Sequence, residues 1–399
     1  MKKVFSVLTV AVLAVSTVFA GFSGSANVDL GYNFDNGNYG FTNGENKVEG
    51  TFELHSDSAE KKGEGSVYAG IKASMSVAVE DVAASEPLKL EVALDEAYVA
   101  GENWKVDITA NKGGIDYAKS AIEKFNKKPV TFVPKYVGTA DKVYGVNGNV
   151  YDYKFGFGLV GNSTAKTFQT SAYFATPKYT LVDGLTLEAG AQGDVAIADS
   201  KAINGGLGLA LAYVNGDFSA SVASDMGLAV KGKNDVAFDA DVAAKVAYNP
   251  VTVDLYYATK ANNGVDNLLS AQVVADLKDF APVTVSFTGK DLVNTQDLAA
   301  AFSLKFADLK LNATVKGGYV VAAKTWSTGA DVDYTIDPVG KIYAGFELKG
   351  ADKLAEATVK VGLENTTLIN NATLKAEYAS GNLVDKKAGA LTTSCTIEF

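Results

Sequence analysis

Residues 22–34 read FSGSANVDLGYNF, and apolar and polar side chains alternate along this stretch. Val28 and Leu30 fall on one face of an extended chain, whereas Asn27 and Asp29 fall on the other. Successive side chains of a β-strand point to opposite faces, so this period of two predicts a strand with one apolar and one polar face.

The same alternation returns along the rest of the chain. Clear examples are residues 47–55, 66–79, 151–159 and 391–399. The predicted strands are about 9 to 14 residues long, which suits a bilayer crossing better than the shorter strands of soluble sheets. Apart from residues 112–140, nothing in the sequence could cover the apolar face of so large a sheet.

Aromatic residues stand near the ends of the predicted apolar faces, as in the girdles at the two interfaces of membrane barrels. They are Tyr32, Phe34, Trp104, Phe168, Tyr213, Phe218, Tyr248, Trp326, Tyr334 and Tyr378.

We therefore expect an all-β fold, a single transmembrane antiparallel β-barrel of about 20–22 strands within a range of 18–22. A barrel leaves no sheet edge unpaired, which suits an exported chain whose only cysteine, Cys395, allows no internal disulfide. In the predicted register Cys395 faces lipid. A multidomain β-sandwich adhesin or a surface-layer protein is the alternative fold.

The first 20 residues have a different character. Lys2 and Lys3 precede an apolar run at 4–15, and Val18-Phe19-Ala20 has the small residues of a cleavage site. We expect residues 1–20 to be a cleaved signal peptide, with residues 21–399 forming the barrel in the outer membrane. No apolar run of 18 residues follows, so the sequence predicts no transmembrane helix after cleavage.

A count of 22 strands places the tight turns on one side, which would be periplasmic, together with both termini. This count includes a short strand at 141–147, joined by the turn Asn147-Gly148-Asn149 to a strand at 150–160. The tight turns are expected at 215–217, 249–250, 280–282, 307–308 and 337–339. The longer, external connections are expected at 35–45, 81–86, 200–205, 261–267, 291–295 and 381–387.

Composition excludes several functions. The chain carries 36 basic residues, all lysine, against 46 acidic ones, so nucleic acid is not an expected partner. His55 is the only histidine and falls on the polar face of its predicted strand. Without His or Cys clusters, we expect no metal, no cofactor and no enzymatic activity.

Residues 112–140 break the pattern and form the third external connection. Ile115, Ala118, Ile122 and Phe125 recur at helical spacing. One interpretation is a solvated outer loop with a frayed helix. The other is a segment folded into the lumen, with Ile115, Ile122 and Phe125 packed against the wall and its lysines paired with wall carboxylates. The candidate constriction or pore-lining residues are Lys119, Lys124, Lys127, Lys128, Asp29, Glu49, Glu53, Asp239, Asp241, Asp331 and Asp333.

In its pattern the chain resembles a bacterial porin over its whole length after residue 20, and Phe399 gives it the aromatic end common in outer-membrane barrels. More narrowly, it resembles the treponemal (spirochaete) major surface proteins in its signal, its Gly/Asn-rich first hairpin, and the strands at 48–56 and 66–79. That resemblance implies an abundant, oligomeric surface protein with pore activity and adhesion to host surface or matrix proteins. No site residue is carried over from it.

The sequence thus favours a water-filled diffusion channel for small hydrophilic solutes and ions, with a preference for cations. Its partners would be these solutes and the outer-membrane lipid. An adhesin or coat protein anchored by the barrel is the alternative function. A transporter with an N-terminal plug is disfavoured because strand alternation begins at Phe22.

Overall fold

The computed structural model describes residues 23–41, 47–55, 67–79, 88–108, 115–127, 143–162, 167–197, 201–231, 236–261 and 265–398. Within them, no helix is long and apolar enough to cross a membrane. The strands are β1 (Ser23–Asn33), β2 (Tyr39–Phe41), β3 (Lys47–His55), β4 (Tyr68–Val79), β5 (Leu88–Gly101), β6 (Trp104–Asp107), β7 (Val143–Val150), β8 (Tyr153–Asn162), β9 (Thr167–Ala175), β10 (Tyr179–Val182), β11 (Leu185–Ile197), β12 (Lys201–Asn215), β13 (Phe218–Lys231), β14 (Val236–Tyr248), β15 (Val251–Ala261), β16 (Val265–Asp276), β17 (Val283–Asp291), β18 (Asp297–Phe306), β19 (Leu311–Val320), β20 (Thr325–Ile336), β21 (Gly340–Gly350), β22 (Leu354–Asn365), β23 (Ala372–Ala379) and β24 (Ala390–Glu398). The helices are α2 (Lys119–Lys124) and the 3-10 helix η2 (Leu383–Asp385).

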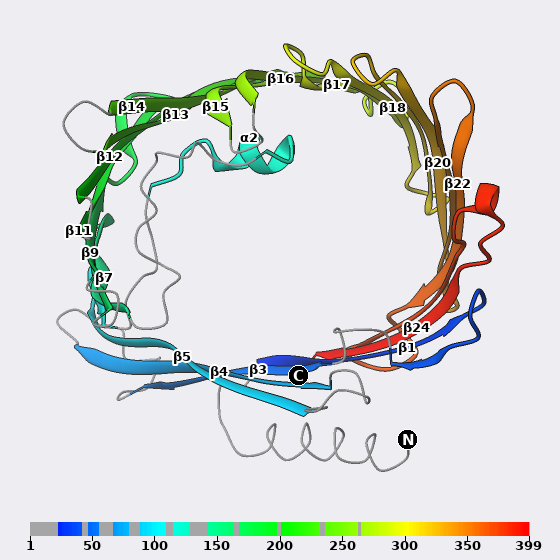
Figure 1. Cartoon of the computed structure of the whole chain (residues 1–399), viewed down its shortest axis with the longest axis horizontal. Coiled ribbons are helices and arrows are strands. Elements are labelled where there is room, and N and C mark those ends of the chain that lie inside the picture. The colour runs from blue at the N-terminus through cyan, green and yellow to red at the C-terminus, as the bar shows by residue number, and fades with distance from the viewer. Residues whose placement is uncertain are drawn as a thin grey trace.

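The strands pair antiparallel with their neighbours, and Figure 1 shows the sheet curving into a ring. β2 and β3 pair with opposite ends of β1, so they share one position in the ring. β9 and β10 share another, because both pair with β11. β24 returns to pair with β1. The 24 described strands therefore occupy 22 positions around the ring, which confirms the predicted all-β, barrel-like fold.

The inner face of the sheet is fixed by α2, which lies inside the ring and packs near Tyr256 of β15. Residues that are directly opposite each other on paired strands lie on the same face, so the strand register identifies the inner face of the other strands. The pairs Ala299–Gly318 and Gly318–Ser327 are examples. Val315, on the opposite face of β19, is 57 % exposed. Large apolar side chains thus point outward while polar ones face the lumen, which is the arrangement expected of a barrel surrounded by lipid.

Hydroxyl groups on the outer face bond to the sheet itself. Ser224 Oγ donates to the carbonyl oxygen of Asp241 at 2.9 Å, and Thr328 Oγ1 donates to that of Lys316 at 3.2 Å. An unsatisfied polar group is costly in hydrocarbon, so these bonds let short polar side chains occupy an otherwise apolar belt.

The ring closes at a seam between the first and last strands. Nine consecutive pairs join β1 to β24, from Ser25–Glu398 to Asn33–Ala390. At the outer end, Asp35 accepts hydrogen bonds from the backbone N–H groups of Ala388 at 2.6 Å and Gly389 at 3.0 Å. These two bonds lower the pKa of the Asp35 carboxyl. The first hairpin is therefore tied directly to the last external connection.

The predicted turn at Asn147-Gly148-Asn149 is wrong. β7 continues through these residues, pairing Asn147 with Asp107 of β6, and the chain turns instead at Tyr151 and Asp152. A Cβ at Gly148 would clash with the carbonyl oxygen of Lys105, so this glycine allows two strands to approach closely. Tyr151 and Asp152 supply the turn with φ of 46° and 67°.

Several external connections are shorter than predicted. The expected loop at 35–45 contains β2, whose Phe41 pairs with Leu30. The expected loop at 200–205 lies mostly in β12, where Gly205 pairs with Gly193. The glycine and asparagine residues in these stretches are typical of loops, but the paired strands and their backbone hydrogen bonds continue through them. The predicted loop at 81–86 and the predicted signal peptide at 1–20 lie outside the described residues.

Candidate functional site

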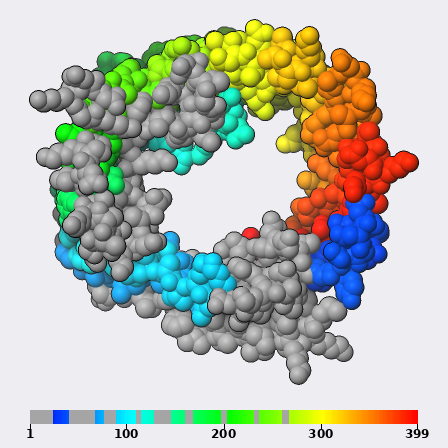
Figure 2. Space-filling model, viewed as in Figure 1, coloured from blue at the N-terminus to red at the C-terminus, as the bar shows by residue number. Residues whose placement is uncertain are grey.

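The lumen contains a short segment, residues 115–127, that includes α2. It belongs to the third external connection and lies against the inner wall near β15 (Figure 1). In the space-filling view of Figure 2, an opening passes through the middle of the ring, and this segment narrows it from one side.

Apolar packing holds the segment to the wall. Ala118, Ile122 and Phe125 are buried in one cluster with the wall residues Tyr256 and Leu268. The Phe125 and Tyr256 rings are stacked, with centroids 6.5 Å apart. This cluster is the hydrophobic core among the described residues, and it consists of a segment docked on the lumen wall. The predicted packing of Ile122 and Phe125 is found in the structure.

A wall carboxylate binds the beginning of α2. The backbone N–H of Ala118, the N-cap residue, donates to Asp225 Oδ2 at 2.8 Å. The first N–H groups of a helix have no partner within it, and the helix dipole favours an anion there. Because the segment offers no side-chain cap of its own, Asp225 supplies one from β13.

The wall beneath the segment is shaped to receive it. Ile115 is buried, and its N–H donates to Gln192 Oε1 of β11 at 3.0 Å. A Cβ at Gly190 would clash with the Ile115 side chain, and one at Gly208 would lie 2.5 Å from Tyr117 Cδ2. Two glycines of adjacent strands therefore leave room for the side chains of the segment.

The lysines of α2 behave differently from one another. Lys124 forms an ion pair with Asp254 of β15, as predicted for this segment. Lys119 was predicted to pair with the wall, but it pairs with Glu123 of its own helix at 3.7 Å. Residues four apart lie on the same side of a helix, which explains the local pair. At 64 % exposure, the Lys119 side chain is directed to solvent.

Lys127, at the end of the segment, lies near charged groups of β17 and β18. Burial lowers the pKa of Lys127, while the carboxylates of Asp291 and Asp297 act in the opposite direction. Lys290 adds to the lowering by like-charge repulsion. Within the described residues Lys127 makes no ion pair with a wall carboxylate, unlike Lys124. Lys128 lies outside the described residues.

Acidic residues gather on the wall under and beside the segment. Asp225 and Asp241 are directly opposite each other on β13 and β14, and both are buried. Tyr256 donates its hydroxyl to Asp241 Oδ2 at 3.5 Å, and Thr259 donates to Asp239. The candidates Asp239 and Asp241 thus belong to the inner wall but are not open to the channel. Among the described residues no group of His, Cys, Asp or Glu is arranged to hold a metal ion.

Docking of the segment should depend on pH through Asp116. Burial, followed by the nearby Asp225 carboxylate, raises the pKa of Asp116 to about 6. The usual value is 3.8, so the docked state favours the protonated acid. The contribution of Asp116 to docking is therefore expected to be largest below about pH 4, to fall as the pH rises to about 6, and to be constant above that.

Amide hydrogen exchange of residues 115–127 in the detergent-solubilised barrel would measure this dependence. Asp116→Asn should match the native chain at pH 4 and protect the segment better than the native chain at pH 7. Equal protection of both proteins at pH 7 would contradict the prediction. Lys119 and Glu123, which also act on Asp116, stay unchanged in this comparison.

The remaining acidic candidates lie on other parts of the wall. Asp29 of β1 is buried and accepts a hydrogen bond from the Asn27 amide at 3.0 Å. Glu49 and Glu53 lie in β3, where they pair across the ladder with Ser76 and Lys72 of β4. The structure therefore does not bring these residues to the docked segment.

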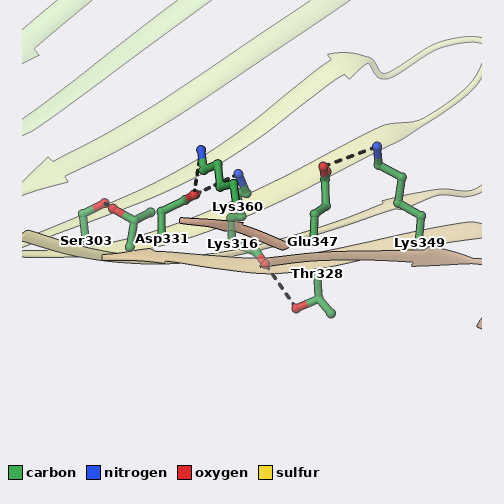
Figure 3. Close-up of polar contacts among 8 residues, drawn as sticks. Ser303, Lys316, Thr328, Asp331, Glu347, Lys349 and Lys360 are labelled. Carbon is green, nitrogen blue, oxygen red and sulfur yellow. Dashed lines mark hydrogen bonds and ion pairs between the residues drawn. The ribbon is translucent and has the colours of Figure 1, made fainter. Parts of the chain in front are cut away.

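Asp331 and Asp333 of β20 stand on a different stretch of the inner wall. Asp331 accepts from Lys316 at 3.0 Å and forms an ion pair with Lys360 at 3.1 Å, while Asp333 accepts from the Asn312 amide at 2.9 Å. Figure 3 shows Asp331 and its two lysines on one face of the sheet, with Thr328 projecting from the other. The candidates thus form two groups. Asp239 and Asp241 are buried on the wall near the docked segment, whereas Asp331 and Asp333 lie on an open part of the wall, where Asp331 forms ion pairs.

Sequence reasoning missed most of the partners in both areas. Period-two alternation alone could have placed the strand residues among them on the inner face, because each stands an even number of residues from another polar position of its strand. Asp116 belongs to the inserted segment, where this alternation does not apply. The missed residues are Asp116, Gln192, Asp225, Asp254, Tyr256, Lys316, Glu347, Lys349, Glu356 and Lys360.

Comparison with solved structures finds porins and an usher translocation pore at low sequence identity. One mutant of the Rh. blastica porin has a TM-score of 0.36 and 10% identity, covering 95% of this chain and 99% of that one. A triple mutant of Rhodopseudomonas blastica porin has a TM-score of 0.35 and 10% identity, with the same coverage. The translocation pore of the P pilus usher PapC has a TM-score of 0.41 and 8% identity, covering 94% and 99%. No family model and no curated protein matches the chain.

Proposed function

We propose that this chain is a porin that forms a water-filled diffusion channel for small hydrophilic solutes across a bacterial outer membrane. The ring of paired strands with apolar side chains outside and polar ones inside carries the proposal. A ring of 22 strand positions is wide enough to leave an aqueous interior, whereas small barrels are filled by their own side chains.

In this proposal the segment at 115–127 sets the width of the channel. Its buried contacts with β13, β15 and β16 keep it on the wall, and its exposed side chains, among them Lys119, border the opening. The excess of acidic residues over lysines makes the pore prefer cations, and the basic segment moderates that preference.

Deletion of residues 125–135 is expected to raise single-channel conductance and to strengthen cation preference, because it removes the end of the segment and Lys127, Lys128 and Lys135. Planar-bilayer recordings would give the conductance, and reversal potentials in a salt gradient would give the selectivity. A heat-dependent shift on a denaturing gel would show that the shortened barrel is folded. Unchanged conductance and selectivity in a folded variant would place the segment outside the permeation path.

The adhesin or coat-protein alternative rests on the resemblance to treponemal surface proteins, as do a homo-oligomeric state and host partners. The connections seen between the later strands, such as 321–324 and 351–353, are short and offer little binding surface. A purified protein that binds host matrix but gives no channels in bilayers would favour that alternative over the porin.

A further inference from the structure

A recess of about 700 Å³ lies in the lumen wall near the external end of β17 to β22. Small inner-face residues line it, namely Ala299, Gly318 and Ser327, which are directly opposite one another on three adjacent strands. Because these side chains are small, they leave a recess on the inner face while the strands stay paired. The volume is in the range of small-molecule sites.

The deep end of this recess carries a surplus of positive charge. Lys316, which lines it, and Lys360 share the single carboxylate of Asp331, with one ammonium at each oxygen (Figure 3). Lys360 also acts on the Glu377 carboxylate of β23, which pairs with Lys375 at 3.0 Å, so these three ammonium groups and two carboxylates carry one surplus positive charge. The lysine side chains are 46 % and 51 % exposed, so this charge is accessible from the lumen.

The outer end has the opposite surplus. Lys349 lies between Glu347, at 3.4 Å, and Glu356, at 3.9 Å, and all three residues line the recess. One ammonium for two carboxylates leaves one negative charge. The other charged lining residues, Lys290 and Asp297, balance each other in number. The recess is therefore neutral as a whole but polarised along the strands.

The register gives the separation of the two ends. Lys316 and Glu347 are both opposite Gly329, but the Lys316 ammonium group reaches Asp331, two residues further along β20; Lys349 is opposite Ser327, four residues from Asp331. At the rise of a β-strand these offsets correspond to about 7 and about 13 Å. An extended peptide of two to four residues covers this distance, whereas the charges of a free amino acid are too close together.

We infer that this recess is a binding subsite for short zwitterionic peptides entering the channel. The peptide carboxylate would bind Lys316 and Lys360, its ammonium group would bind Glu347 and Glu356, and its small side chains would lie along β20 from Gly329 to Ser327, where the row of small residues begins. The inference rests on the proposed porin function, and it names a solute class that the wall favours. Neutral sugars lack both charges and would pass without binding.

The test compares trialanine with N-acetyl-trialanine, trialanine amide, alanine and maltotriose as blockers in single-channel recordings. Trialanine alone should interrupt the current at low millimolar concentration, because it alone carries both charges at the required distance. Saturation-transfer NMR on the detergent-solubilised barrel would measure binding of the same compounds independently of any current. Equal effects of all three trialanine forms would overturn the inference.

A paired variant identifies the binding place. Glu347→Gln combined with Glu356→Gln should raise the half-blocking concentration of trialanine about three- to tenfold, as expected for two partly exposed charge contacts. Glu364→Gln, on the same strand as Glu356 but outside the recess lining, is the matched control and should leave it unchanged.

The outcomes separate the inference from the proposed function. If the native protein forms normal channels but the paired variant changes neither block by trialanine nor its binding in NMR, the subsite is overturned and the proposed porin function stands. Absence of channels would contradict the porin, and the NMR comparison of native and paired-variant protein would still decide the subsite.

Discussion

Phe125→Asp is expected to release the inner segment and raise the conductance of the channel toward that of the deletion variant. The Phe125 side chain is 1% exposed and stacks on Tyr256. Loss of a buried phenylalanine costs about 3–5 kcal/mol, and a carboxylate placed there would also be desolvated. The remaining anchors are the buried side chains of Ile115 and Ile122, the backbone hydrogen bonds of Ile115 and Ala118, and the ion pair of Lys124. They would have to hold the segment without its largest buried side chain and against a buried charge.

Asn126→Asp is the matched control, because it adds the same charge one residue away at an exposed position. Its conductance should stay near that of the native channel. Hydrogen exchange at 115–124 would confirm that release, rather than charge alone, changes the current. A Phe125→Asp channel with native conductance and native protection of this segment would contradict the docking described above.

Val315→Lys is expected to cost about 2–4 kcal/mol of barrel stability, because it places an ammonium group in the lipid-facing belt near the bilayer midplane. Thr314→Lys, at the neighbouring inner position, should be nearly neutral, because Thr314 lies on the inner face of β19, where a charged side chain is hydrated by the aqueous lumen. Urea titrations of the barrel refolded in lipid vesicles would give both free energies of unfolding. Equal costs at the two positions would show that the faces are assigned wrongly.

Much of the barrel could be predicted because the alternation of apolar and polar side chains is a local pattern that repeats in every strand. Alternation in residues 22–34 assigns Val28 outward and Asn27 inward without knowledge of any partner strand. Turn positions were less certain, since Gly148 and Gly205 resemble loop residues although both lie in strands. A glycine needed for close strand approach and one needed for a turn are identical in the sequence, and only the neighbouring strand distinguishes them.

The site was partly predictable for a related reason. Helical spacing selected Ile122 and Phe125, since one short helix has one apolar face. The residues that receive this face, Tyr256 and Leu268, come from strands more than 100 positions away along the chain. Alternation places Tyr256 and Leu268 on the inner face of the barrel, but it does not predict which part of the wall the segment contacts. The pairing of Lys119 was mispredicted because a local partner, Glu123, competes with every distant one.

The seam between β1 and β24 has a consequence for the order of folding. Its pairs join residues such as Val28 and Cys395, which are separated by nearly the whole chain. The other ring contacts join much closer residues, and the widest separation among the described pairs is the 46 residues between Trp104 and Val150. Hairpins can form in microseconds, but closing a very long loop has a high entropic cost and slows contact formation. Closure should therefore be the last and slowest step of folding. Until it occurs, both terminal strands are open edges, and premature meeting of two unfinished chains there would give interlocked dimers in place of a pore.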